Sequence, residues 1–275
     1  MSTRIKAVDR PQAPVAGAQT LRRGLSIVRL LTQIGPGGLR IGEIGRRLAL
    51  NKATAIRLTL TLVDEGFVVQ DRATGRYRLG PEAFAAGLAA EPNYELQRAF
   101  APTLRALAAE SGDTVFFTVL HGYESICLSR DEGEFPIRNQ LIKPGDRWPL
   151  GVGAGSCAML AALSDAEIDD VLRLNAGLRA DRFPRCTDRE IRRLVGETRA
   201  MGYCMQPGLV LEDSWAVGAV VRDGHDQPVA SISIAAIKSR LGIARGAILG
   251  NRLIQASKGI AAALGSASTS ATEPG

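Results

Sequence analysis

Residues 39–66 read LRIGEIGRRLALNKATAIRLTLTLVDEG, and this stretch decides the fold of the first part of the chain. Apolar residues at helical spacing predict a short helix over 41–48 and a longer one over 52–65. Gly66 is suited to end the second helix, because glycine readily adopts the left-handed conformation that follows helix C-termini. Two short helices separated by so brief a break predict a helix-turn-helix.

The flanking sequence completes this small domain. A helix over 20–34 is predicted by its apolar stripe, and a glycine- and proline-rich stretch at 35–38 ends it. The stripe of this first helix consists of Leu21, Leu25, Val28 and Leu31. Downstream, 67–69 and 76–79 predict two short strands joined by a turn at 71–75. Three helices followed by a hairpin are typical of the winged helix-turn-helix.

The helix over 52–65 is the predicted DNA-reading element. We expect its apolar stripe to face the domain core, which leaves a polar face outside. The expected inward residues are Ala53, Ile56, Leu60 and Val63, and the expected outward residues are Thr54, Arg57 and Thr61. Arginine can fork onto guanine, and threonine can touch a base edge or a thymine methyl. Asn51 has two interpretations, as the cap of this helix or as a DNA contact.

Cations around this helix extend the predicted interface. Lys52 begins the helix, where backbone amides also favour phosphate, and the hairpin can reach phosphates or a minor groove. The predicted DNA-binding residues are Arg22, Lys52, Thr54, Arg57, Thr61, Arg72, Thr74 and Arg76. The alternative is a solvated basic face on a winged helix that contacts other proteins. The agreement of charge, helix order and hairpin favours DNA.

Charge is distributed unevenly along the 275 residues. Residues 1–80 hold 14 Lys and Arg against 5 Asp and Glu, a balance of +9, whereas residues 81–275 hold 20 against 23, a balance of −3. A basic first third on a slightly acidic remainder is typical of a DNA-binding domain joined to a domain that does not bind DNA.

Composition indicates a globular protein of the cytoplasm. No apolar run is long enough for a membrane span, and the start of the chain lacks the apolar core of a secretory signal. The four cysteines lack the paired spacing of a zinc site or a disulfide framework, so we expect reduced thiols, no metal and no cofactor. The cysteines are Cys127, Cys157, Cys186 and Cys204.

Helices and strands are mixed after residue 95 without regular alternation, which predicts an α+β domain with an antiparallel sheet. Helices are expected at 96–111, 156–163, 165–174, 188–201 and 243–264, and strands at 114–120, 124–129, 136–142, 216–221 and 229–237. The predicted domain organisation is a disordered tail over 1–19, the winged helix-turn-helix over 20–80, a linker helix over 81–95, an effector-binding domain over 96–265 and a tail over 266–275.

Several segments resemble the IclR-type (isocitrate lyase regulator) transcriptional regulators. Residues 21–31, 38–48 and 51–58 are similar to the three helices of their DNA-binding domain, and 75–80 to the end of their wing. In the second part, the matching segments are 147–150, 202–203, 231–234 and 239–241. The resemblance covers nearly everything from residue 20 to 265, and the order and spacing of the pieces are more specific than any single piece.

The resemblance implies a GAF-like effector domain, a dimer or tetramer, and control of a promoter by a small metabolite. It implies the following effector-binding residues: Leu150, Gly153, Ala154, Gly155, Ser156, Gln206, Trp215, Ala216 and Ser233. Three stretches depart from the family. Residues 151–158 read GVGAGSCA where members commonly read His-Ala-Thr-Ala-x-Gly-Lys-Ala, Gln206 replaces an acidic residue, and Trp215 and Ala216 replace common Arg or Cys positions.

The candidate pocket leaves alternatives open. The amides of 153–157 can hold a carboxylate at a helix start, yet Ser156 can equally be a plain helix cap. Ser233 is either a pocket hydroxyl or an ordinary strand serine, and Trp215 is either a pocket wall or core. A nucleotide-binding loop is disfavoured, because the final glycine spacing and the lysine are missing.

An enzyme is the least favoured alternative. Cys157 or Ser156 at a helix start could be a nucleophile, but a base is needed, and His121 and His225 both fall in turns. The sequence therefore predicts a regulator that binds double-stranded DNA at an operator organised as an inverted repeat. Its expected effector is a small metabolite such as an organic or aromatic acid. We expect a homodimer or homotetramer with no membrane partner. The competing hypothesis is a small-molecule sensor whose winged helix serves assembly.

Overall fold

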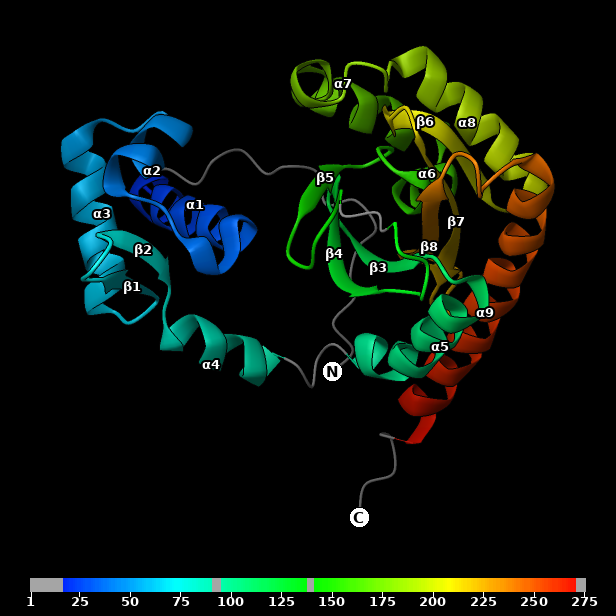
Figure 1. The fold of residues 1–275 in the computed structure, drawn as a ribbon, viewed down its shortest axis with the longest axis horizontal. Coiled ribbons are helices and arrows are strands. Elements are labelled where there is room, and N and C mark those ends of the chain that lie inside the picture. Colours follow the sequence, from blue (N-terminus) through cyan, green and yellow to red (C-terminus); the bar gives the residue numbers. More distant parts are fainter. Residues whose placement is uncertain (1–16, 91–94, 138–140, 271–275) are drawn as a thin grey trace. The chain divides into compact units, whose positions relative to one another are not determined.

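The computed structural model describes residues 17–90, 95–137 and 141–270. It divides the chain into two compact units, and the boundary along the sequence falls between Glu95 and Leu96 (Figure 1). Each unit is described by itself. The tail expected over 1–19 lies almost wholly outside the described residues, as does 271–275 at the other end. Among the described residues, no helix combines the length and apolar character that a membrane span requires.

The N-terminal unit contains the expected three helices and hairpin. Its elements are α1 (Gln19–Ile34), a 3-10 turn (Gly35–Gly37), α2 (Ile41–Arg47), α3 (Lys52–Asp64), β1 (Val68–Asp71), β2 (Arg76–Leu79) and α4 (Pro81–Ala90). β1 and β2 pair antiparallel, and Leu39 adds a single bridge to Tyr77. Gly66 follows α3 with a φ of 72°, the left-handed backbone expected there. Of the linker helix predicted over 81–95, α4 covers 81–90, and 91–94 lies outside the described residues.

The core of the N-terminal unit lies where α1, α2 and α3 meet the hairpin. Its buried members are Ile27, Leu31, Leu39, Ile44, Leu58, Val68 and Tyr77. The stripe predicted for α1 was partly wrong. Leu31 is buried, but Gly24 and Ile27 occupy the inner face, and Leu21 and Leu25 are 64% and 44% exposed. α1 carries more apolar residues than one face can bury, so spacing alone did not identify the inner set.

The C-terminal unit is built on a single six-stranded antiparallel sheet with the strand order β5-β4-β3-β8-β7-β6. Its strands are β3 (Thr114–His121), β4 (Glu124–Asp131), β5 (Arg147–Pro149), β6 (Cys204–Leu211), β7 (Ser214–Arg222) and β8 (Pro228–Ile237). Its helices are α5 (Glu95–Ser111), α6 (Ala154–Ala161), α7 (Asp165–Arg182), α8 (Asp188–Met201) and α9 (Ile243–Ser270). The mixed α+β class and the antiparallel sheet are confirmed.

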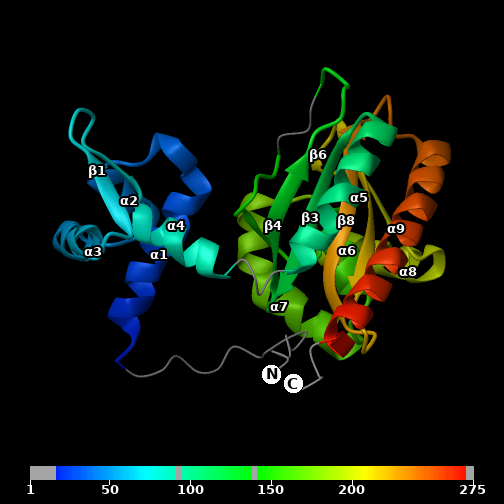
Figure 2. The ribbon, with the colours of Figure 1, turned by 90° about the horizontal axis from the view of Figure 1, so that it is seen from below.

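Helices cover both faces of this sheet (Figure 2). α5 and α9 pack on one face, where Phe100 stacks on Phe117 with ring centroids 4.4 Å apart. α6, α7 and α8 pack on the other face, around a second core that includes Leu150, Met159 and Ile191. The sheet is therefore the middle of three layers, and its strands alternate side chains between the two cores.

Some predicted boundaries were wrong. No strand forms at 136–137 or 141–142, and 138–140 lies outside the described residues. β5 and β6 were not predicted as strands, and α7 extends eight residues past the predicted end at Leu174, to Arg182. α9 continues to Ser270, through the first half of the predicted tail. Capping explains the better-predicted starts, because Ser164 and Thr187 cap α7 and α8 and bond to the amides of Glu167 and Glu190.

Candidate functional site

The start of α3 is fixed by a side-chain cap. Asn51 Oδ1 accepts a hydrogen bond from the amide of Thr54 at 2.8 Å, which satisfies one of the donors left free at a helix N-terminus. The cap interpretation of Asn51 is thus confirmed. Lys52 is exposed at the first helical position, beside the positive end of the helix dipole.

The prediction of which side of α3 faces the core was wrong. The buried residues are Ala55, Leu58 and Thr59, while Ala53 is exposed and Leu60 is 45% exposed. Ile56 and Val63 are only half-buried. The true inner face is rotated from the predicted stripe. The stripe was mispredicted because leucines at 58, 60 and 62 offer more than one apolar face, and because a buried threonine occupies an inward position.

This rotation changes the polar face of α3. Arg57 and Thr61 are exposed as expected, whereas Thr54 is half-buried at the edge of that face. Thr61 Oγ1 donates to the carbonyl of Arg57 at 3.0 Å, so its hydroxyl is already engaged by its own helix. The Arg57 guanidinium, by contrast, has no hydrogen bond or ion pair with any described residue. It is therefore the most available reading side chain of α3.

The tip of the wing is organised by Asp71. Its Oδ1 accepts from the amides of Ala73, at 2.9 Å, and Thr74, at 3.2 Å. The hydrogen bonds from the backbones of Thr74 and Ala73 hold the pKa of this carboxyl below its usual value. Arg72 and Thr74 are exposed on the turn that results.

Arg76, by contrast, is occupied within the unit. Its guanidinium donates to the carbonyl of Gly38 at 2.9 Å and lies 3.8 Å from the Glu43 carboxylate. This link between the wing and α2 joins residues far apart in sequence and was not predicted, and it makes Arg76 less available for DNA. Exposed arginines that were not predicted include Arg46 and Arg47 on α2 and Arg78 on β2, and the clustering of basic residues was the available signal.

A pocket in the C-terminal unit lies between the sheet and the start of α6. It is lined by seven of the predicted effector residues: Gly153, Ala154, Gly155, Ser156, Gln206, Ala216 and Ser233. Ten further lining residues were not predicted: Phe116, Thr118, Ser125, Leu141, Ile142, Trp148, Val152, Val210, Ser214 and Ala235. None of these lining residues carries a formal charge.

Glycines bring the start of α6 against the strands. A Cβ on Gly218 would lie 2.6 Å from the amide nitrogen of Gly155, and one on Gly155 would lie 2.6 Å from Ser231 Oγ. Gly153 precedes the helix with a φ of 86°, a conformation that favours glycine. The amides of Ala154, Gly155 and Ser156 have no acceptor within the helix, so their partial positive charge lies at the pocket.

Ser156 does not cap α6, which corrects one of the two predicted interpretations. Gly153 holds the cap position, and Ser156 lies inside the first turn. Its buried Oγ accepts from the amide of Gly151 at 3.0 Å and lies 3.5 Å from the carbonyl of Pro149. Ser156 therefore holds the preceding loop closed, and the glycine-rich sequence reflects close approach rather than a nucleotide-binding loop.

Gln206 places an unsatisfied donor at the pocket. The residue is 4% exposed, and its Nε2 atom has no hydrogen-bond partner among the described residues. A buried amide without a partner costs about 1–3 kcal/mol. A ligand with an acceptor oxygen at this point would remove that cost.

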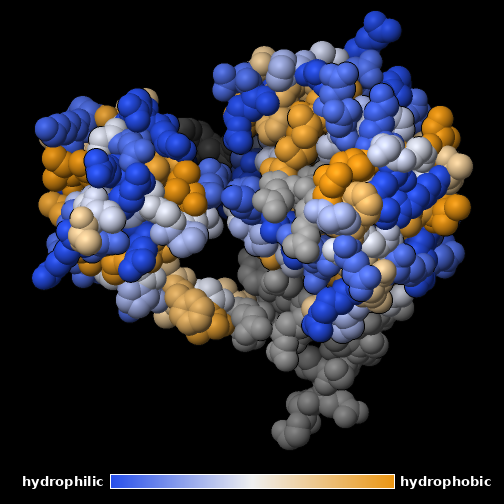
Figure 3. Space-filling view, in the orientation of Figure 1, coloured by the Kyte–Doolittle hydropathy of each residue, from blue (hydrophilic) through white to orange (hydrophobic). Residues whose placement is uncertain are grey.

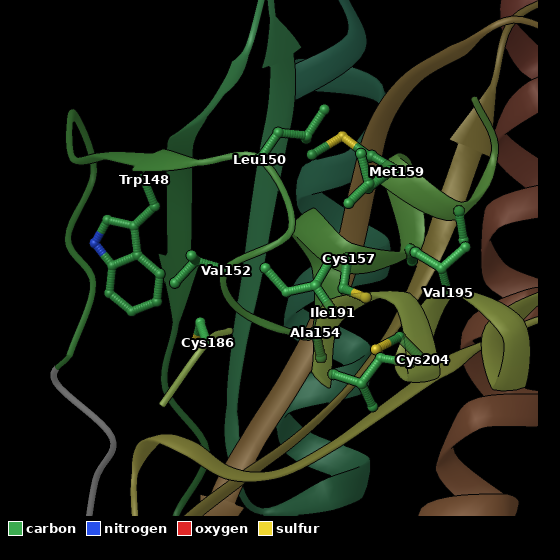
Figure 4. Packing of buried hydrophobic residues seen from close by; sticks show 14 of the residues in the cluster. Trp148, Leu150, Val152, Ala154, Cys157, Met159, Cys186, Ile191, Val195 and Cys204 are labelled. Atoms are coloured by element: carbon green, nitrogen blue, oxygen red, sulfur yellow. The ribbon is translucent and has the colours of Figure 1, made fainter. Parts of the chain in front are cut away.

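Two predicted effector residues do not line the pocket. Leu150 is fully buried, and its side chain lies beside Met159 rather than beside Trp148 (Figure 4). Trp215 packs with the core on the opposite face of the sheet, so its core interpretation is correct. The reason is strand periodicity, because Ser214 and Ala216 point into the pocket and the residue between them must point away.

The Cys157 thiol lacks the chemistry of a nucleophile. It is fully buried, and Figure 4 shows its sulfur beside that of Cys204. Hydrogen bonding with Cys204, together with burial, raises the pKa of Cys157 well above its ordinary value. The reactive thiolate is therefore disfavoured at neutral pH.

Comparisons with known proteins agree on one family for both units. The IclR helix-turn-helix domain matches residues 20–72, and the C-terminal domain of the bacterial transcriptional regulator IclR matches residues 89–262. The chain is 31% identical over 271 residues to the HTH-type transcriptional repressor AllR of Klebsiella pneumoniae, covering 96% of this chain and 97% of that protein. It is 27% identical to the transcriptional repressor IclR of Escherichia coli strain K12, over 92% and 93% of the two chains.

Solved structures of the same fold include two useful examples. An IclR family transcriptional regulator from Brucella abortus superposes with a TM-score of 0.73 at 23% identity, covering 94% of this chain and 95% of that one. An IclR homologue from Microbacterium hydrocarbonoxydans, complexed with 4-hydroxybenzoate, gives a TM-score of 0.71 at 20% identity, covering 90% and 99%.

Proposed function

The chain belongs to the IclR family of bacterial transcriptional regulators, and from that premise we propose what each of its two units binds. It is a DNA-binding transcriptional regulator whose promoter binding is modulated by a small metabolite. We assign DNA contact to the outer face of α3 and the wing, and effector binding to the pocket between the sheet and α6.

The observation that carries the DNA assignment is the set of uncompensated cations around α3. Lys52, Arg57 and Arg72 are exposed and have no ion pair with any described residue. Phosphates supply the missing negative charge, and a helix of this kind fits the major groove. Mobility shifts with DNA from upstream of the protein's own gene test this assignment. A retained complex that resists random competitor DNA supports it, and equal competition by any DNA contradicts it.

Arg72→Ala should weaken binding to every duplex by a similar factor. Its place at the wing tip suits a phosphate contact, which carries no sequence information. The slope of log affinity against log salt concentration should fall by about 0.9 for one lost phosphate contact. Arg192→Ala, which removes an exposed arginine of the C-terminal unit, is the control and should leave the slope unchanged. A loss confined to one sequence would argue against the assignment of the wing.

The pocket favours a small molecule with an apolar body and a single carboxylate. Phe116, Trp148 and Val152 supply apolar walls, and the start of α6 with Gln206 supplies donors. A second negative charge would find no cation among the described lining residues, and burying an unpaired charge is costly. We therefore assign the effector to the aromatic or other apolar monocarboxylates, a class that includes the 4-hydroxybenzoate held by the structural relative.

Gln206→Leu should weaken effector binding about tenfold or more, because a hydrogen bond to a charged group contributes about 1.5–3 kcal/mol. Calorimetry with a panel of benzoates and short aliphatic monocarboxylates identifies the tightest ligand for the comparison. Without ligand, the variant should be at least as stable as the parent, since an unpartnered buried amide is removed. Trp215→Phe, on the opposite face of the sheet, is the matched control. Unchanged affinity in Gln206→Leu would refute the role of this residue.

We further propose that the protein acts as a symmetric dimer. α4 has no buried residue, and Phe84 and Leu88 are 69% and 53% exposed. Figure 3 shows this apolar surface over α4. A two-fold dimer reads half-sites related by two-fold symmetry, which fits an inverted-repeat operator. Sedimentation of the Phe84→Ser, Leu88→Ser double variant should show dissociation, whereas an unchanged mass would place the interface elsewhere.

A further inference from the structure

Leu60 has an apolar side chain that does not pack into the core of its unit. It lies on α3 with 45% of its surface exposed, and it is absent from the cluster formed by Ile27, Leu58 and their neighbours. The inner face of α3 is taken by Ala55, Leu58 and Thr59, which turns Leu60 to the opposite side. Figure 3 shows apolar surface over α3 among hydrophilic side chains.

The neighbours of Leu60 define the kind of partner that would cover it. Arg57 lies one turn before it, and Ala53 lies two turns before it on the same face. Both Ala53 and Arg57 are exposed. Asp64 follows one turn later, where its carboxylate would repel phosphate, so the contacting face does not extend to Asp64. An apolar group within a basic face fits a partner that offers negative charge and methyl groups together.

DNA offers that combination in its major groove. Phosphates line the groove edges, and the C5 methyl of thymine is the apolar group on its floor. A protein partner would instead have to supply carboxylates for Arg57 and Lys52 around an apolar centre. The charge balance of residues 1–80, which is +9, favours the nucleic acid.

We propose that Leu60, together with the methyl group of Ala53, reads thymine methyls that flank the base contacted by Arg57. This inference rests on the DNA contact proposed above, and it names the element of the operator that α3 selects. Leu60 is then a specificity-determining residue, and the operator half-site contains thymine within reach of the second and third turns of α3.

The test uses DNA selected by the full-length protein from a pool of random-sequence duplexes. Each thymine of the selected duplex is replaced in turn by deoxyuridine, which removes only the C5 methyl. We expect one or two positions per half-site at which uracil weakens binding by about fourfold, the effect of burying one methyl group. Leu60→Ala should bind the thymine and uracil forms of at least one of these positions equally.

Two controls separate the outcomes. Leu60→Met keeps an apolar side chain and should keep the preference for thymine. Leu25→Ala changes another exposed leucine of the same unit, on α1, and should also keep it. If selection enriches a duplex but no thymine preference depends on Leu60, this inference is overturned while DNA binding stands. If selection enriches no duplex at all, the DNA contact itself is overturned.

Discussion

Replacing Asp113 with alanine should lower the stability of the C-terminal unit more than any other single change considered for this protein. The Asp113 side chain is 2% exposed and pairs with Arg240 at 2.9 Å and Arg245 at 2.8 Å. Both arginines also donate to the carbonyl of Ser111, so the carboxylate joins α5, β3 and the start of α9. Removing one partner of a buried pair costs about 3–5 kcal/mol, and we expect about 3 because both arginines retain some solvent access.

Tryptophan fluorescence provides a selective measurement of this loss. Both tryptophans, Trp148 and Trp215, lie in the C-terminal unit, so their emission during urea unfolding reports that unit alone. Asp169→Ala is the matched control. It breaks an exposed pair with Arg192 and should cost under about 1 kcal/mol. Equal effects of the two substitutions would mean that the Asp113 network contributes no more than a surface pair.

Arg57→Ala should reduce affinity for the selected operator by about 5- to 150-fold, the effect of losing about 1–3 kcal/mol of base discrimination. Binding to a shuffled duplex should change little, because phosphate contacts from other residues remain. The physical reason is that the Arg57 side chain is exposed on the outer face of α3 and its guanidinium has no partner among the described residues. The measurement is fluorescence anisotropy with both duplexes at one salt concentration.

Thr61→Ala is the comparison for Arg57→Ala. The Thr61 hydroxyl already donates within α3, so its loss should cost less than the loss of Arg57. An Arg57→Ala variant that loses equal affinity for operator and shuffled DNA would assign Arg57 to phosphate. The reading side chain would then have to be another residue of the exposed face.

The winged helix-turn-helix was predictable because its signals are local. The α3 cap, the glycine after α3 and the alternation of Arg76, Tyr77, Arg78 and Leu79 each follow from neighbouring residues. The side of α3 that faces the core was not predictable in the same way. Leucines at 58, 60 and 62 offer competing stripes, and the choice between them is made by packing against α1 and α2.

The part of the pocket that comes from one continuous segment was predictable, whereas the part that strand pairing brings together was not. Residues 153–156 were identified from one glycine-rich stretch. Phe116, Thr118 and Trp148 come from strands that pairing brings beside that stretch, and no sequence pattern predicts such pairing. Trp215 was placed in the effector set by resemblance alone, although the alternation of β7 assigns it to the other face.

The missing strands have a similar explanation. β6 contains Pro207 and Gly208, residues that are rare in strand interiors, and its pairing with β7 is irregular there. The stretch 136–142, with apolar residues at both of its ends, suggested a strand, yet Leu141 and Ile142 line the pocket from a loop. In both places tertiary contacts override local propensity.

The most direct test of the account is one titration series with the full-length protein. Its affinity for the selected operator and for a shuffled duplex is measured from 50 to 200 mM KCl, with and without the tightest monocarboxylate. We predict a linear fall of log affinity with log salt, preference for the operator throughout, and a change of about fivefold or more in operator affinity on adding ligand. An affinity that changes with neither salt concentration, DNA sequence nor ligand would contradict the account.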